Sequence, residues 1–217
     1  LKGSDLTAAN MANIRAEGVD FSDLPMTDLD ASAAKFSRCI FDKAQLNDAS
    51  FQSCEISESD FIGCSLENAD FSKTTLTTLS FKDAVLLATS FDSAHISRCD
   101  FTQVRCESVS FTSTLFDQVR LANGNYLKCD FSKLDLSSYD LHSADFTESN
   151  MANCHLDQVR FDGANLTRCD FTGASLQSAA LRNVTAKAVN FMQANLTGAV
   201  LNGGNFSKGC FIKAKLA

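Results

Sequence analysis

The residues that could do chemistry in this sequence are its nine cysteines and three histidines. Such residues can bind metal ions or form disulfides, and a cysteine beside a histidine can act as a nucleophile. Most of the cysteines share one position of a five-residue pattern, two places before an apolar residue: Cys39, Cys54, Cys64, Cys99, Cys129, Cys154 and Cys169. This placement predicts small buried thiols in a reducing compartment, with neither disulfides nor metal ligands.

The histidines do not complete a catalytic or metal-binding set. His95, His142 and His155 occupy positions that the pattern predicts to face solvent, and their spacings fit no zinc motif. No serine can be matched with a histidine and an aspartate, and no glycine-rich phosphate loop occurs. We therefore expect no catalytic, cofactor-binding or metal-binding residues and no enzyme activity in this chain.

The positions of these cysteines and histidines follow from a regular pattern, in which an apolar residue occurs at every fifth position. In the run NLTRCDFTGASL, Leu166, Phe171 and Leu176 are five apart, and a small residue stands two places before each. The register extends from Leu6 to Leu216 without an insertion, and all 18 Phe of the chain fall in it. A helix repeats every 3.6 residues and a strand every 2, so neither alone explains the pattern. It predicts a chain that turns a corner every five residues and places two side chains of each five inside.

A twenty-residue period lies on top of the five-residue one. Phenylalanine recurs every twenty residues in one column and in a second column ten residues away, with Leu or Ile between them. Four segments of five residues therefore make one coil, and successive coils stack. No two of the seven cysteines stand twenty residues apart, so none would lie directly over another in the next coil. We expect the first column to form the structural core: Phe51, Phe71, Phe91, Phe111, Phe131, Phe171, Phe191 and Phe211.

The runs SRCIFDKAQLNDASFQSCEISESDFIGCSLENADFS (37–72) and ADFTESNMANCHLDQVRFDGANLTRCDFTGASL (144–176) resemble pentapeptide-repeat proteins, whose motif is A(D/N)LXX. The resemblance covers essentially residues 4–216. It implies an all-β fold, a right-handed quadrilateral parallel β-helix. With twenty residues per coil, this chain would have about eleven coils at a spacing of ~4.8 Å.

The uninterrupted repeat predicts a single domain over residues 1–217, without a membrane span or signal peptide. The buried thiols favour the cytoplasm, or a host cytosol if the chain belongs to a secreted effector. The net charge of −7 and the buried aromatic residues argue against binding of nucleic acid.

Three side chains near the end of the sequence suggest a contact surface. Met192 and Ile212 are predicted to face outward one coil apart, with the outward thiol of Cys210 beside them. Apolar side chains grouped on a surface commonly mark a binding site. We expect a protein partner or an adjacent domain here, and we interpret the chain as part of a larger bacterial protein, such as a HECT-like effector ubiquitin ligase, which is similar in architecture.

Two functional hypotheses remain. The first is a non-catalytic scaffold for protein–protein interaction. The alternative comes from the resemblance: one branch of the family protects DNA gyrase and topoisomerase IV from quinolones by imitating DNA. The acidic pI of about 4.9 has the appropriate sign. However, duplex DNA carries one charge per ~1.7 Å, far more than this chain could supply. We favour the scaffold.

Overall fold

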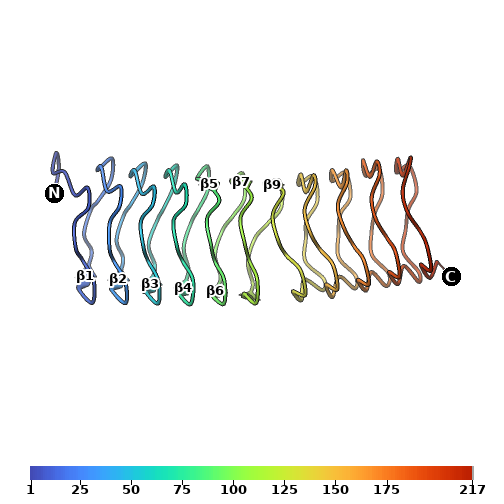
Figure 1. Ribbon diagram of the computed structural model, residues 1–217, viewed down its shortest axis with the longest axis horizontal. Coiled ribbons are helices and arrows are strands. Elements are labelled where there is room, and N and C mark those ends of the chain that lie inside the picture. The colour runs from blue at the N-terminus through green and yellow to red at the C-terminus, as the bar shows by residue number, and fades with distance from the viewer. Residues whose placement is uncertain (217) are drawn as a thin grey trace. The chain divides into compact units, whose positions relative to one another are not determined.

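The computed structural model describes residues 1–216, and the chain divides into two compact units, Leu1–Arg120 and Leu121–Ala217. In each unit the backbone winds in successive coils, as Figure 1 shows. Residues twenty positions apart lie side by side in neighbouring coils, as in the parallel bridges Asp30↔Ser50 of the first unit and Asp145↔Asn165 of the second. The all-β parallel solenoid is therefore confirmed, whereas the single domain over residues 1–217 stays a prediction.

Short strands on one side of the first unit form a six-stranded parallel sheet. In order, these are β1 (Arg15–Glu17), β2 (Lys35–Ser37), β3 (Glu55–Ser57), β4 (Thr75–Thr77), β6 (His95–Ser97) and β8 (Leu115–Asp117). On another side, β5 (Val85–Leu87) pairs with β7 (Arg105–Glu107). The second unit contains β9 (Asn125–Leu127). Strands of three residues are the longest that fit between corners five residues apart.

Regular strands mark fewer turns than the number of coils that the sequence predicts. The longest ladder of regular strands marks six turns, whereas the sequence predicts about eleven coils. In most of the second unit, neighbouring coils meet through single bridged pairs such as Asn150↔Asp170. A five-residue repeat reports the winding of the chain, but it does not report where a side is straight enough to form a regular strand.

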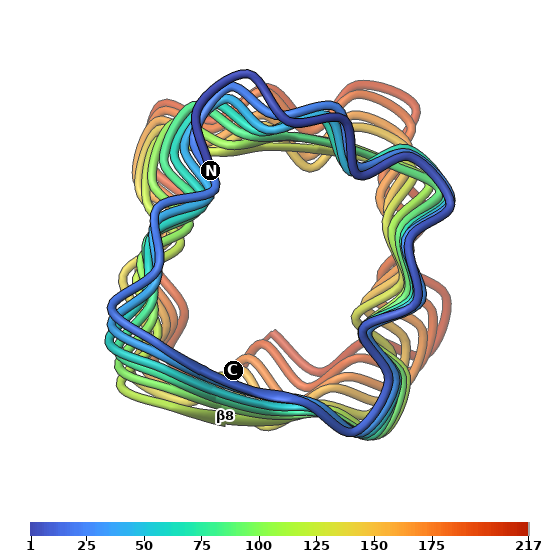
Figure 2. The ribbon, with the colours of Figure 1, turned by 90° about the vertical axis from the view of Figure 1, so that its left-hand side faces the viewer.

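Aromatic rings fill the interior of the first unit, whose coils have a four-sided outline in Figure 2. Phe51 and Phe71 stack with ring centroids 4.7 Å apart, and Phe61 and Phe81 stack at 5.2 Å. The two columns meet edge to face, with 5.9 Å between the centroids of Phe51 and Phe61. Offset stacking and T-shaped contacts are the two geometries that the ring quadrupole favours. Phenylalanine thus makes both the stacked contacts between successive coils and the edge-to-face contacts between the two columns.

The second unit uses the same contacts with a substitution at one centre. Tyr126 occupies an apolar centre outside the two phenylalanine columns and stacks on Phe146 at 5.0 Å, and its hydroxyl donates to the Leu121 carbonyl at 3.1 Å. Phe171 and Phe191 stack at 5.1 Å. The buried hydroxyl is accommodated because it has this acceptor.

The corners impose a backbone constraint on every fifth residue. From Gly3 to Lys213, the residue two places after each apolar centre has a positive φ. This left-handed region is costly for residues with a branched Cβ and accessible to Gly, Asn and Asp. Thr78, with a φ of 60°, is the one β-branched residue among these corners.

Hydroxyl groups occupy several of the small inward positions, and hydrogen bonds satisfy them. Thr89 Oγ1 donates to the Leu66 carbonyl at 2.7 Å. Ser59 Oγ makes two bonds: it donates to the Ser57 carbonyl at 2.8 Å and accepts from the Cys39 N–H at 3.0 Å. A buried polar group is tolerated when it is paired in this way.

Replacing Thr78 by asparagine should raise the free energy of unfolding by about 1 kcal/mol, because the left-handed corner then loses its β-branched side chain. The same change at the preceding residue, Thr77→Asn, is the matched control and should give no gain, since Thr77 lies in β4 with an ordinary strand backbone. Chemical denaturation monitored by circular dichroism measures both. Equal shifts in the two variants would contradict the corner argument.

Removing the Ser59 hydroxyl should cost about 1–3 kcal/mol of unfolding free energy, because Ser59→Ala leaves the buried Cys39 N–H without its acceptor. Ser57→Ala provides the control, since it removes a hydroxyl from the outward side of β3 two residues away. Thermal unfolding of the two proteins compares the effects. A stable Ser59 variant would show that this hydrogen bond contributes little.

Candidate protein-binding surface

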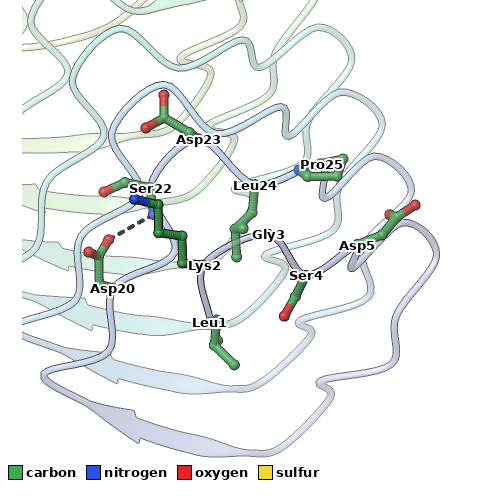
Figure 3. Close-up of a pocket in the computed structure, with 10 residues that line it drawn as sticks. All are labelled: Leu1, Lys2, Gly3, Ser4, Asp5, Asp20, Ser22, Asp23, Leu24 and Pro25. Atoms are coloured by element: carbon green, nitrogen blue, oxygen red, sulfur yellow. Dashed lines mark hydrogen bonds between the residues drawn. The ribbon is translucent and has the colours of Figure 1, made fainter.

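A cavity of about 590 Å³ opens at the start of the first unit, among the residues shown in Figure 3. Its wall combines the apolar Leu1 and Leu24 with the carboxylates of Asp5, Asp20 and Asp23, and it includes no histidine or cysteine. Asp20 Oδ1 accepts the Ser22 N–H at 2.9 Å, and the side chain and backbone of Ser22 lower the pKa of Asp20. A carboxylate that is ionised and bound to its own turn is poorly suited to proton transfer at neutral pH.

A histidine and an aspartate do meet on the second unit. His142 Nδ1 and Asp140 Oδ1 are 2.8 Å apart, and Arg160 Nη1 lies 3.1 Å from Asp140 Oδ2. Burial opposes ionisation of Asp140, but the hydrogen bonds and positive charges of His142 and Arg160 outweigh it and lower its pKa. The other ring nitrogen of His142 faces the Asn123 amide at 3.5 Å. An amide is not a nucleophile, so the pair lacks the third member of a catalytic triad.

The remaining histidines are far apart in the repeat. His95 lies on β6 of the first unit. In the second unit, backbone bridges join His155 to Asp135 and Ser175 in the neighbouring coils. Within residues 1–216, no three His, Cys, Asp or Glu side chains are placed to hold a metal ion. The same residues include no helix with the length and hydropathy needed to cross a bilayer.

The seven cysteines at the small inward positions, and Cys106 at an apolar centre, are all buried thiols that form no disulfide within residues 1–216. Burial raises the pKa of the Cys54, Cys64 and Cys154 thiols to about 12 and that of Cys99 to about 11. Cys64 Sγ lies 2.7 Å from the Phe41 carbonyl one coil back. Nucleophilic attack requires the thiolate, so these groups are unreactive at neutral pH.

The apolar side chains near the end of the second unit are placed as a group on its outer surface, which we call the Met192 patch: Met192, Cys210 and Ile212. Ile212 is 60% exposed, while Met192 and Cys210 are partly buried. Backbone hydrogen bonds join the two coils here, from Phe191 N to the Cys210 carbonyl at 2.7 Å and from Gln193 N to the Ile212 carbonyl at 2.9 Å. The patch is therefore held on a hydrogen-bonded support.

Lysines flank the Met192 patch, a feature that the repeat pattern did not reveal. Lys208, Lys213 and Lys215 are exposed, and none forms an ion pair with another described residue. No Asp or Glu occurs after Asp170. The distribution of charge along the chain contains this signal, whereas the net charge of −7 conceals it.

The predicted core phenylalanines occupy two environments. Phe51, Phe71, Phe91, Phe111, Phe131, Phe171 and Phe191 are completely buried. Phe211 is partly exposed, although its ring lies 5.3 Å from that of Phe191. Burial of a centre requires a coil on each side, and among the described residues Phe211 has a neighbouring coil on one side.

Coils of four five-residue sides, with apolar centres and left-handed corners, define a class of parallel β-solenoid. Models of pentapeptide repeats match residues 36–85, 149–185 and 179–216, and the chain belongs to the pentapeptide-repeat family. No curated protein sequence matches it.

Among solved structures, HetL from Nostoc sp. strain PCC 7120, a pentapeptide-repeat protein involved in regulation of heterocyst differentiation, is similar with a TM-score of 0.60 and 21% identity. The match covers 91% of this chain and 89% of HetL, and it shows the shared fold. Full-length QnrB1, a plasmid-mediated fluoroquinolone resistance protein, matches at 15% identity and a TM-score of 0.38, over 91% of this chain and 93% of QnrB1.

Thiol labelling should distinguish the two kinds of cysteine. Native protein should react rapidly with iodoacetamide at Cys210 and slowly elsewhere, because the other thiols are buried and inaccessible to the reagent. Denatured protein should label all nine. Mass spectrometry counts the adducts, and Cys210→Ser should abolish the rapid phase. Rapid labelling of Cys54 or Cys64 in native protein would contradict the buried assignment.

Proposed function

We propose that this chain is a non-catalytic scaffold that binds a protein through the Met192 patch. The exposed Ile212 side chain carries the proposal, because it stands beside two further apolar groups instead of alone. Isolated apolar side chains are normal on protein surfaces, but grouped ones favour a contact. The unreactive thiols and the incomplete His142 cluster agree with a role in binding instead of catalysis.

The hydrogen-bonded coils support the proposal on energetic grounds. The backbone around Met192 and Ile212 is already tied to its neighbour, so little conformational freedom would be lost on binding. A preorganised surface retains more of its contact energy as affinity. In a flexible loop, exposed apolar side chains could fold inward. The rigid backbone of these coils keeps them at the surface.

The charge distribution supports DNA mimicry less well than it supports the scaffold. Residues 1–120 carry 18 Asp and Glu against 10 Lys and Arg, a net charge of −8, but residues 121–217 carry 8 against 9, a net charge of +1. In the second unit, asparagines also alternate with aspartates in one column, where Asn150 Nδ2 donates to Asp130 Oδ1 at 3.1 Å and Asn190 Nδ2 to Asp170 Oδ1 at 3.0 Å. A DNA mimic needs negative charge along its whole length. Membership of a larger bacterial effector stays a prediction of the sequence.

The scaffold can be tested by placing a photo-crosslinking amino acid at position 212 in the producing cells. We expect a protein adduct at this position, because a bound partner would cover Ile212. The control is the same amino acid at position 115, since Leu115 is a similarly exposed apolar residue, 65% exposed, in the first unit. Mass spectrometry would identify adducts at each position.

Adducts that are equally frequent at positions 212 and 115 would indicate random collision and would contradict the proposal. Met192→Thr should weaken the adduct at position 212 without lowering the melting temperature, since its side chain is partly exposed.

A further inference from the structure

The charges of this chain are strongly segregated along the sequence. All 26 Asp and Glu lie in residues 1–170, whereas residues 171–217 contain five Lys and Arg and no acidic residue. Of these five, only Arg182 is in an ion pair among the described residues, with Asp162 at 3.4 Å. Lys208, Lys213 and Lys215, which stand close to Cys210 and Ile212 in the sequence, are therefore not neutralised by ion pairs within the described residues.

The first unit presents a surface with the opposite charge and the same apolar character, which we call the acidic strip: Asp20, Ile40, Asp42, Asp60 and Ile62. Parallel bridges join Asp20 to Ile40 and Ile40 to Asp60, so the three residues follow one another along successive coils. Asp42 Oδ1 accepts the Ile62 N–H at 3.1 Å, which places the second isoleucine beside the second aspartate. Ile40 is 40% exposed.

The carboxylates of the acidic strip have no ion-pair partners among the described residues, although the N-terminal ammonium contributes to the lowered pKa of Asp20. None of Asp20, Asp42 and Asp60 forms an ion pair with a residue in the described part of the chain. Partial burial, followed by the charge of Asp42, raises the pKa of Asp60. Lys43 is the residue next to Asp42, but its side chain extends over Gly63 of the next coil. Its Cγ lies 3.5 Å from the position that a Cβ would take at Gly63. A cation from outside would relieve this repulsion.

We infer that the acidic strip binds the Met192 patch and its lysines on a second copy of this chain. Both surfaces combine exposed isoleucine with unpaired charge, and the two charges are opposite. Both also repeat at the same coil spacing of about 4.8 Å, so side chains of one can fit between those of the other over successive coils. The inference rests on the proposed function, because it names the partner of the Met192 patch.

The contact is heterologous, because the two surfaces that meet in it are different. A copy that uses its acidic strip still has a free Met192 patch, and a third copy can add in the same way. Each surface spans only a few coils, which is small for a stable complex, so we expect a dissociation constant on the order of 100 µM. Because the contact is charged and exposed, added salt should weaken it.

Sedimentation equilibrium of the purified chain tests the inference. In about 50 mM salt, the average mass should rise beyond that of a dimer as the concentration increases, and about 500 mM salt should reduce association at least about five-fold. A monomer at every concentration would overturn the inference. A closed dimer would also overturn it, because the inference includes the addition of a third copy.

Two variants make the test sharper, each disabling one surface. Ile212→Asp with Lys213→Glu disables the Met192 patch, and Ile40→Lys with Asp60→Lys disables the acidic strip. Each variant alone should remain a monomer. An equimolar mixture retains one intact surface on each partner and should give a 1:1 heterodimer that grows no further. A mixture that stays monomeric, or that grows beyond two copies, would overturn the inference.

Controls separate this inference from the scaffold itself. Leu115→Asp changes an exposed apolar residue outside both surfaces and should leave self-association unchanged, and circular dichroism should show that all variants are folded. If the purified chain does not associate but the adduct at position 212 contains a different protein, the scaffold stands and the inference fails. If position 212 gives no specific adduct, the scaffold itself fails.

Discussion

The parallel backbone ladder is the interaction on which the rest of this structure depends. Each coil donates and accepts hydrogen bonds about twenty residues away, and the ladder keeps its register because every fifth residue adopts a left-handed conformation. A corner of that kind turns the backbone from one side of the coil to the next without consuming extra residues. The interior is shaped accordingly: one large and one small side chain from each side point inward, and the remaining side chains are free to vary. Stability, surface and charge are thus nearly independent properties of this chain.

The packing of the interior follows from this geometry. Stacked rings in successive coils lie at the spacing that the ladder imposes, as in the pair Phe41–Phe61 with centroids 4.6 Å apart. That distance lies within the range in which offset aromatic rings attract each other. The small inward positions serve a second purpose, because Ser, Thr and Cys there bond to backbone carbonyls. The apolar core therefore contains a polar network without exposing it to water.

The sequence was most informative about this interior and least informative about the surface. The five-residue register identified the buried phenylalanines and the thiols because both are consequences of a strict period. It could not identify Phe116 as partly exposed, because burial depends on the coil that lies alongside and not on the residue's own position. The division after Arg120 does not interrupt the repeat and therefore has no signature in its register. The lysines around Ile212 were visible in the sequence, but their significance depends on which side of the coil they occupy.

The coil of four equal sides has a consequence for how such chains diverge. Duplication or deletion of twenty residues adds or removes one whole layer and leaves every later face where it was. A change of five residues preserves the apolar rhythm equally well, yet it rotates everything downstream by a quarter turn about the axis of the coils. Insertion or deletion of five residues could therefore move a surface from one side of the coil to the next side while the apolar core beneath it stays the same. New relative orientations of old surfaces are therefore accessible to this architecture without the invention of new side chains.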